Sequence, residues 1–153
     1  MLNQNKIENT DFKLEGFIPY QLAVVAASVS KAFSKTYASR FGITIAQWRV
    51  LAAIGREPNC TASSIIEHTA MDKVQISRAV SILIDTGHIK SQIDPNDRRN
   101  SVLAFTDQGQ SVYNKIIPAG MAFERKLLEI FTQEEIEQFD YLLSKLNIQS
   151  KKL

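Results

Sequence analysis

The segment from Asp72 to Thr106 constrains this chain more than any other part of its sequence. A helix-patterned stretch, Asp72–Thr86, stops at Gly87 and is followed by two short β-like runs, 88–93 and 100–105. A polar turn with two adjacent arginines joins the runs: Asp94-Pro95-Asn96-Asp97-Arg98-Arg99. Helix, hairpin and basic hairpin tip are the layout of a winged helix-turn-helix. A helix has the width of the DNA major groove, and an arginine on a thin ribbon can enter the minor groove.

Apolar spacing and capping residues predict five further helices around this segment. A first helix opens near Pro19 and ends at Gly42. The N-terminal residues of the other four are Thr44, Thr61, Thr106 and Thr132. Pro118 is expected to kink the helix that begins at Thr106, because it removes one backbone hydrogen bond. The predicted fold class is therefore mainly α with a small β-hairpin wing, in the order α-α-α-α-β-β-α-α.

Composition excludes several classes of protein. The chain is 44% hydrophobic and 22% charged, as expected for a globular protein rather than a disordered one. It has no apolar run of about 18 residues that would predict a membrane span. The polar stretch 1–13 lacks the apolar core of a signal peptide, so we expect a cytoplasmic protein. The single Cys60 agrees with a reducing compartment, since it has no intrachain disulfide partner.

The net charge of +2 says little about a nucleic-acid partner. Residues 61–110 carry five bases and six acids, so a DNA-binding hypothesis depends on where the charges lie and not on their sum. The only histidines are His68 and His88, and no Cys/His cluster with metal-ligand spacing exists. Nothing indicates a catalytic set either. We therefore expect no cofactor, no metal and no enzyme.

The apolar stripes of the terminal helices predict a domain organisation. Residues 1–41 are expected to form an N-terminal arm and first dimerisation helix, 42–106 the winged helix-turn-helix region, and 107–153 the C-terminal dimerisation helices. A monomer of this size would leave those stripes partly in water, so we expect a two-fold homodimer. Such a dimer places two winged helix-turn-helix regions about one DNA turn apart, as a pseudo-palindromic operator requires.

At this point the chain resembles the MarR family of transcriptional regulators, over roughly residues 14–146. The resemblance is strongest in the helix 73–83, in Gly87-His88-Ile89 that follows it, and in Asp97-Arg98-Arg99. Phe105-Thr106 stands where the family has a Leu-Thr pair. The resemblance implies a repressor of transcription that binds double-stranded DNA. It also implies that Arg99 enters the minor groove while Asp97 orients its guanidinium.

The residues expected to contact DNA lie on the exposed side of the helix 72–86 and at the hairpin tip: Lys73, Val74, Gln75, Ser77, Arg78, Ser81, Asp97, Arg98 and Arg99. Gln pairs bidentately with adenine, and Arg pairs with guanine or phosphate. For Gln75 a capping role is the alternative, because Asp72-x-x-Gln75 has capping-box spacing. Arg98 either binds phosphate or is simply exposed to solvent.

A small effector, aromatic or phenolic, is expected between the first helix and the winged helix-turn-helix region. The opening 14–22 resembles family members linked to aromatic compounds, and Tyr37, Arg40 and Trp48 are the candidate lining residues. A plain core role is the alternative for Trp48. Two other functions stay open: a winged-helix protein-interaction module without DNA binding, and a redox switch through Cys60. For Cys60, an apolar filler is the competing interpretation, because no base lies beside it in the sequence.

Overall fold

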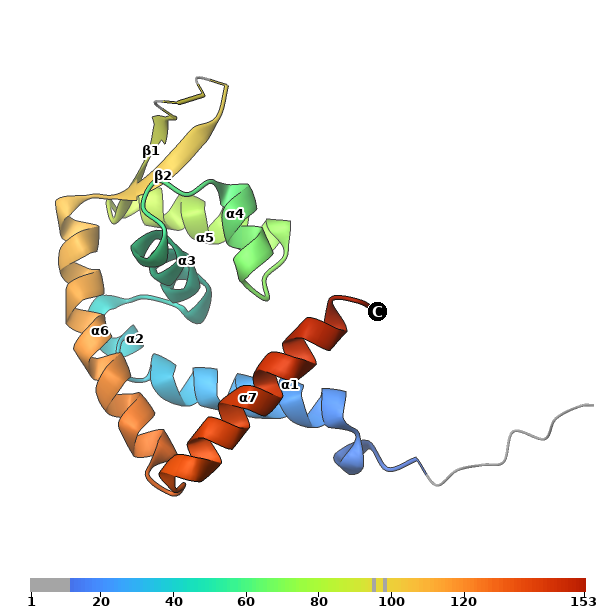
Figure 1. The fold of residues 1–153 in the computed structure, drawn as a ribbon. Coiled ribbons are helices and arrows are strands. Elements are labelled where there is room, and N and C mark those ends of the chain that lie inside the picture. Colours follow the sequence, from blue (N-terminus) through green and yellow to red (C-terminus); the bar gives the residue numbers. More distant parts are fainter. Residues whose placement is uncertain (1–11, 95, 98) are drawn as a thin grey trace, which may run out of the picture.

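The structure is a computed structural model that describes residues 12–94, 96–97 and 99–153. Its elements, shown in Figure 1, follow the order η1 (Leu14–Gly16), α1 (Ile18–Ser34), α2 (Ala38–Phe41), α3 (Ile45–Arg56), α4 (Ala62–His68), α5 (Lys73–Asp85), β1 (Ile89–Ile93), β2 (Ser101–Phe105), α6 (Asp107–Leu128) and α7 (Gln133–Ser150). The predicted mainly α fold with a β-hairpin wing is confirmed.

The first predicted helix is wrong in one respect, because it does not run unbroken to Gly42. α1 ends at Ser34, and the four-residue α2 follows after a turn. The Thr36 hydroxyl donates to the Phe33 carbonyl oxygen at 2.7 Å and satisfies a group that a continuing helix would have used. The turn buries Tyr37, which is 1% exposed, and Gly42 then ends α2 in the left-handed conformation at φ +66°.

Side-chain caps define the N-termini of the later helices. Thr44 and Gln47 form a reciprocal capping box at α3, and Thr132 and Glu135 form another at α7, as their spacing predicted. Thr61 and Thr106 cap α4 and α6 through their hydroxyl groups. α6 continues through Pro118, and its axis bends along its length in Figure 1.

The hairpin is a two-stranded antiparallel sheet in which Ile89 pairs with Phe105 and Ile93 pairs with Ser101. Both strands agree with the predicted β-like runs to within one residue. The loop between α3 and α4 extends this sheet, because the Leu103 amide donates to the Cys60 carbonyl oxygen at 2.9 Å. The sheet is therefore joined to the helices at its base, while its turn projects away from them in Figure 1.

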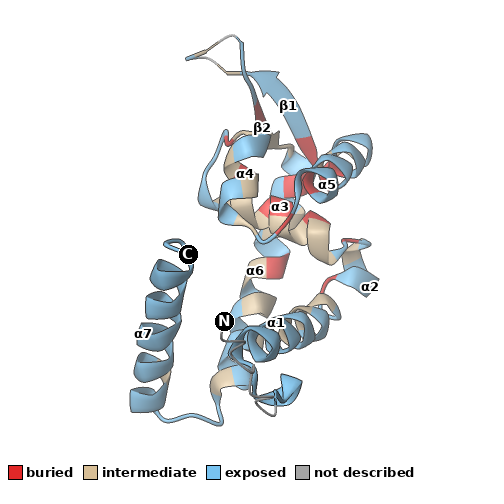
Figure 2. Ribbon diagram, turned by 90° about the vertical axis from the view of Figure 1, so that its right-hand side faces the viewer, coloured by how far each residue is buried: buried red, intermediate tan, exposed pale blue. Residues whose placement is uncertain are grey.

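The buried core lies in α3–α5 and the base of the hairpin, as Figure 2 shows. Leu51, Ile54, Ile65, Ile76 and Leu83 are each at most 1% exposed. In contrast, α1 and α7 contain no buried residue, although both carry large apolar side chains. The chain thus has one core around the winged helix-turn-helix region and two terminal helices with uncovered apolar surfaces.

Candidate nucleic-acid interface

The structure divides α5 into a buried and an exposed face. Ile76, Ala79 and Leu83 are buried in the core. The six predicted DNA-contacting residues of this helix are all exposed: Lys73, Val74, Gln75, Ser77, Arg78 and Ser81. Among them Val74 is 57% exposed, an apolar side chain in a polar row. The exposed face of α5 therefore offers a cationic, hydrogen-bonding and apolar surface to a partner.

The N-terminus of α5 shows which role Gln75 takes in the free protein. The Asp72 Oδ1 accepts from the Gln75 amide at 2.8 Å, and the Gln75 Oε1 accepts from the Asp72 amide at 3.2 Å. This capping box was the alternative interpretation of Gln75. Bidentate pairing with adenine uses both the oxygen and the nitrogen of the side-chain amide. The oxygen that would accept from adenine thus already accepts one hydrogen bond, from the Asp72 amide, in the free protein.

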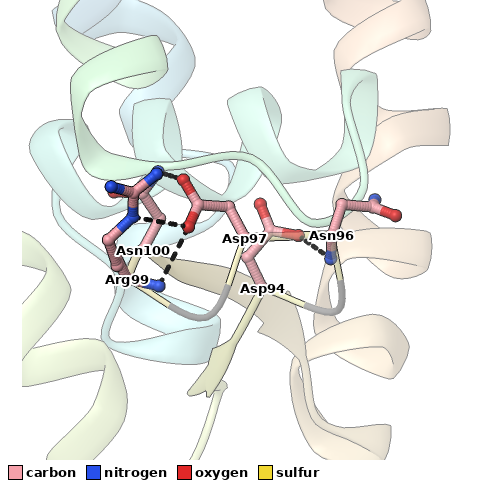
Figure 3. A network of polar contacts seen from close by, with 5 residues as sticks. All are labelled: Asp94, Asn96, Asp97, Arg99 and Asn100. Atoms are coloured by element: carbon pink, nitrogen blue, oxygen red, sulfur yellow. Dashed lines mark hydrogen bonds and ion pairs between the residues drawn. The ribbon is translucent and has the colours of Figure 1, made fainter.

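The hairpin turn is organised around the Asp97 carboxylate, as Figure 3 shows. Its Oδ1 accepts from the Arg99 backbone N–H at 3.1 Å and from the Arg99 Nε at 3.3 Å. Its Oδ2 accepts from the Asn100 Nδ2 at 3.2 Å. Asp94 supports the other side of the turn, since its Oδ1 accepts from the Asn96 amide at 2.8 Å.

These contacts place the Arg99 side chain beside Asp97 while leaving it open to solvent. The side chain of Arg99 is 91% exposed, and that of Asp97 is 39% exposed. A surface ion pair of this kind adds little to stability, so its effect is on the direction of the guanidinium. The predicted contact between Asp97 and Arg99 is thus present. Arg98, the third predicted residue of the turn, lies outside the described residues.

Three contacts that tie the hairpin to the helices were not anticipated from the sequence. The Thr106 hydroxyl donates to the Gly87 carbonyl oxygen at 2.5 Å. Gly109 lies so close to the same loop that a Cβ on it would overlap the His88 carbonyl oxygen. The Asn59 Oδ1 accepts from the Gln92 Nε2 at 3.0 Å and links the α3–α4 loop to β1. The Thr-x-x-Gly spacing at the start of α6 was the available signal for the close approach at Gly109.

The three residues predicted to line an effector site lie in different surroundings. Tyr37 and Trp48 have ring centroids 5.7 Å apart and pack with Phe33, which favours a core role. Burial raises the pKa of Tyr37, and the Arg49 guanidinium partly opposes that rise. Arg40 is exposed on α2, with its guanidinium carbon 5.1 Å from the Phe41 ring centroid. Tyr37 and Trp48 are brought together, whereas Arg40 pairs with a different ring.

Cys60 has the properties of a packed side chain. It is 3% exposed, and burial followed by the nearby Glu57 carboxylate raises the pKa of its thiol. The thiolate is the reactive form, so both influences make the residue less reactive. These features favour the apolar-filler interpretation over the redox switch.

Metal-binding and membrane-spanning features are absent from the described parts of the chain. These parts contain no group of three or more His, Cys, Asp or Glu residues arranged to hold a metal ion. Within the same residues, every helix is too short or too polar to cross a membrane.

Comparison with known proteins agrees with this geometry. Residues 41–100 match the model of the MarR family. The transcriptional regulator BilQ of Clostridium symbiosum is 25% identical over 114 residues, which cover 74% of this chain and 79% of BilQ. A MarR/EmrR family regulator from Acinetobacter sp. ADP1 superimposes with a TM-score of 0.85 at 25% identity, covering 93% of this chain and all of that one.

Two more distant structures share the fold. Escherichia coli MarR, solved as a variant complexed with operator DNA, has a TM-score of 0.74 at 22% identity and covers 84% of this chain and 92% of its own. Bordetella bronchiseptica BpsR has a TM-score of 0.77 at 20% identity and covers 89% of this chain and 96% of its own. The description of BpsR concerns regulation of its DNA binding by 6-hydroxynicotinic acid.

Proposed function

We propose that this chain, whose residues 41–100 match the model of the MarR family of transcriptional regulators, is a homodimeric repressor that a small effector releases from its operator. The operator is a pseudo-palindromic double-stranded DNA. Each protomer inserts α5 into a major groove and the hairpin turn into the adjacent minor groove.

The observation that carries this proposal is the pairing of an exposed α5 face with an oriented arginine on the wing. α5 and β1 are separated by only three residues, 86–88, so the groove-sized helix and the ribbon are parts of one unit. A narrow minor groove concentrates negative potential and attracts a planar guanidinium. Arg99 is exposed at the turn, with its Nε 3.3 Å from the Asp97 carboxylate, so its guanidinium is accessible to such a groove.

In this proposal each residue of the exposed α5 face has a chemical role. Arg78 binds guanine or a phosphate, and Ser77 and Ser81 donate hydrogen bonds. Val74 contacts the methyl group of a thymine, because it is the apolar member of the row. Lys73 in the first turn opposes the helix dipole, which a phosphate partner offsets.

The dimer is proposed from the uncovered apolar surfaces of the terminal helices. On α7, Phe139, Leu142, Leu143 and Leu146 are between 37% and 49% exposed and recur at helical spacing. α1 exposes Ile18, Leu22, Val24 and Val25 by 41% or more. A second copy of the chain covers both surfaces at once in a two-fold arrangement. Residues 1–41 and 107–153 then form the dimerisation part, with 42–106 as the DNA-binding part.

The proposed effector is a small aromatic or phenolic molecule. A site near Tyr37, Trp48 and Arg40, as expected from the sequence, lies where α1 and α2 meet α3. The regulation of BpsR by a small aromatic acid supports the existence of an effector in a protein of the same fold. A ligand needs only about 1–3 kcal/mol of coupling to weaken operator binding 5–150-fold.

The test is selection of bound sequences from random duplex DNA, followed by affinity measurement on the selected operator. We expect two half-sites about 10 bp apart, and affinity that falls steeply as salt rises. Arg99→Ala should weaken binding by about 1–3 kcal/mol per site without lowering the melting temperature. Arg40→Ala, a matched arginine on α2, should leave operator affinity unchanged.

A protein-interaction module without DNA binding is the second candidate, because residues 61–110 carry one more acid than bases. In that case no duplex sequence is enriched, and Arg99→Ala behaves like Arg40→Ala. That result would reject the DNA-binding function.

A further inference from the structure

A pocket of about 370 Å³ lies between α3 and α4, away from the exposed face of α5. This volume falls within the range of about 300–1,000 Å³ that is typical of small-molecule sites. Its apolar lining residues include Ala52, Ala53 and Ile65. None of the sequence-predicted effector residues, Tyr37, Arg40 and Trp48, is among those that line it.

The charged residues around this pocket are mostly basic. Arg49, Arg56 and His68 line it, against the single acid Glu57. The Glu57 Oε2 accepts a hydrogen bond from the Ser64 hydroxyl at 3.1 Å, so this carboxylate has a partner of its own. Among the described residues neither guanidinium takes part in an ion pair. Two guanidinium groups against one carboxylate leave the pocket lining with a net positive charge.

The basic groups are not distributed evenly. Glu57, which accepts the hydrogen bond from Ser64, directly follows Arg56 in the chain. Arg49 lies seven residues before Arg56 on α3, which is two helical turns or about 10 Å away. His68 is one turn further along α4 than Ser64. Among the lining residues, Glu57 is the only acid, so Arg49 has no carboxylate beside it along α3.

We propose that this pocket binds a small organic acid, whose carboxylate pairs with Arg49 while its apolar body covers Ala52, Ala53 and Ile65. A guanidinium binds a carboxylate through two parallel hydrogen bonds, and the small alanine side chains leave room for the body of the ligand. The proposal that the pocket binds an acid depends only on the geometry and charge of the pocket. The proposal that this acid is the effector of a repressor also rests on the proposed function.

Arg49 also connects the pocket to the first helix. Its Nη2 lies 3.5 Å from the Ser30 Oγ of α1, and its charge acts on the Tyr37 hydroxyl. A ligand carboxylate competes for the same guanidinium. Drawing Arg49 into the pocket removes a contact between α1, in the proposed dimerisation part, and α3, in the proposed DNA-binding part.

Calorimetric titration of the full chain in the absence of DNA tests the site directly. The probes are benzoate, phenylacetate and hexanoate, each compared with its uncharged amide of nearly the same shape. We expect at least one acid to bind saturably and its amide to bind at least about tenfold more weakly, because a charge-assisted hydrogen bond is much stronger than a neutral one. If none of the acids binds, or if the amides bind equally well, the proposal is rejected.

Two matched variants locate the acid. Arg49→Gln should weaken binding at least about tenfold, whereas Arg40→Gln should leave it unchanged, since Arg40 does not line the pocket. The reverse pattern would transfer the site to the sequence-predicted residues and overturn the proposal. Should Arg49→Gln fail to fold, amide chemical shifts of the unaltered protein decide: they must change on α3 and α4, and changes confined elsewhere refute the pocket.

A last titration separates this proposal from the proposed function. The bound acid is added to the complex of the protein with its selected operator, where it should lower DNA affinity. If the chain binds the acid through Arg49 but binds no duplex, the pocket stands and the repressor function fails. If operator binding is found and the acid leaves it unchanged, the pocket is not the effector site.

Discussion

Asp97 and Arg99 show how single residues prepare the hairpin turn for a partner. One carboxylate accepts from the Arg99 backbone and side chain and from Asn100. These are local contacts between residues two or three apart, so the turn has them before any DNA is present. In the structure the Arg99 side chain lies beside Asp97, and in the proposed function its guanidinium enters the minor groove.

Val74 is expected to discriminate thymine from uracil in the operator. Replacing the contacted thymine by uracil removes one methyl group and should cost the unaltered protein about 0.8 kcal/mol per half-site, or roughly fourfold in affinity. Val74→Ala should lose this sensitivity, and Ser77→Ala should keep it. Fluorescence anisotropy on the paired duplexes measures both. Equal sensitivity in Val74→Ala would show that another group contacts the methyl.

Gly109→Ala is expected to destabilise the fold. The added Cβ would overlap the His88 carbonyl oxygen, so backbone must move where α6 begins. The free energy of unfolding should fall by about 1–3 kcal/mol or more, as for other overpacked sites. Urea denaturation at fixed protein concentration measures it. Gly16→Ala is the control, since a Cβ at Gly16 would have nothing within 4 Å, and an equal loss there would contradict the explanation.

Cys60 should react slowly with alkylating reagents. Its 3% exposure and raised pKa both lower the availability of the thiolate, so we expect a rate more than about tenfold below that of a free cysteine at pH 8. Mass spectrometry follows the modification over time. Sub-denaturing urea should accelerate it, because the thiol becomes accessible through opening of the fold. A rate equal to that of free cysteine would revive the redox-switch interpretation.

At the scale of elements, the capping box of α5 connects stability with DNA recognition. The same Gln75 side chain that closes the N-terminus of the helix was the candidate for adenine pairing. Both uses involve the same oxygen, so helix capping and adenine pairing compete for its lone pairs. This competition is visible only because the structure shows which partner Gln75 has.

Asp72→Ala should lower stability by about 1 kcal/mol, because it removes the oxygen that accepts from the Gln75 amide at 2.8 Å. Thermal unfolding measures the loss. Thr132→Ala removes the corresponding cap of α7 and serves as the comparison. Only Asp72→Ala should also change operator affinity, since α7 lies outside the proposed DNA-binding part. Equal effects of both variants on DNA binding would contradict the role assigned to α5.

The whole molecule is expected to be a dimer that one charge on α7 can dissociate. Leu143 and Leu146 belong to its exposed apolar stripe, so Leu143→Glu should shift the chain to monomer and remove high-affinity operator binding. Ser144→Glu adds the same charge beside the stripe and should leave the dimer intact. Sedimentation equilibrium distinguishes the masses. A monomer for the unaltered chain would refute the two-fold arrangement.

The sequence by itself determined the order of the elements and most of their boundaries. Caps such as Thr44 and Thr132 and the turn after Gly87 act through neighbours in the chain, so local patterns contain them. The exposed face of α5 was also predicted, because the helical spacing of its apolar residues is a local pattern. The contact between Asp97 and Arg99, which are two residues apart, was expected from the family resemblance of the turn.

Only the tertiary structure decided the features that join distant segments. The break after α1 depends on burying Tyr37 against Phe33 and Trp48, and a helical period cannot show it. The close approach of Gly109 to His88 and the link from Asn59 to Gln92 likewise need two segments placed in space. Arg49 lines a pocket together with residues of α4, whereas the sequence predicted Arg40 as the arginine of the effector site. Contacts between residues far apart in the sequence depend on how segments pack together, and the periodicity of a single segment does not specify that packing.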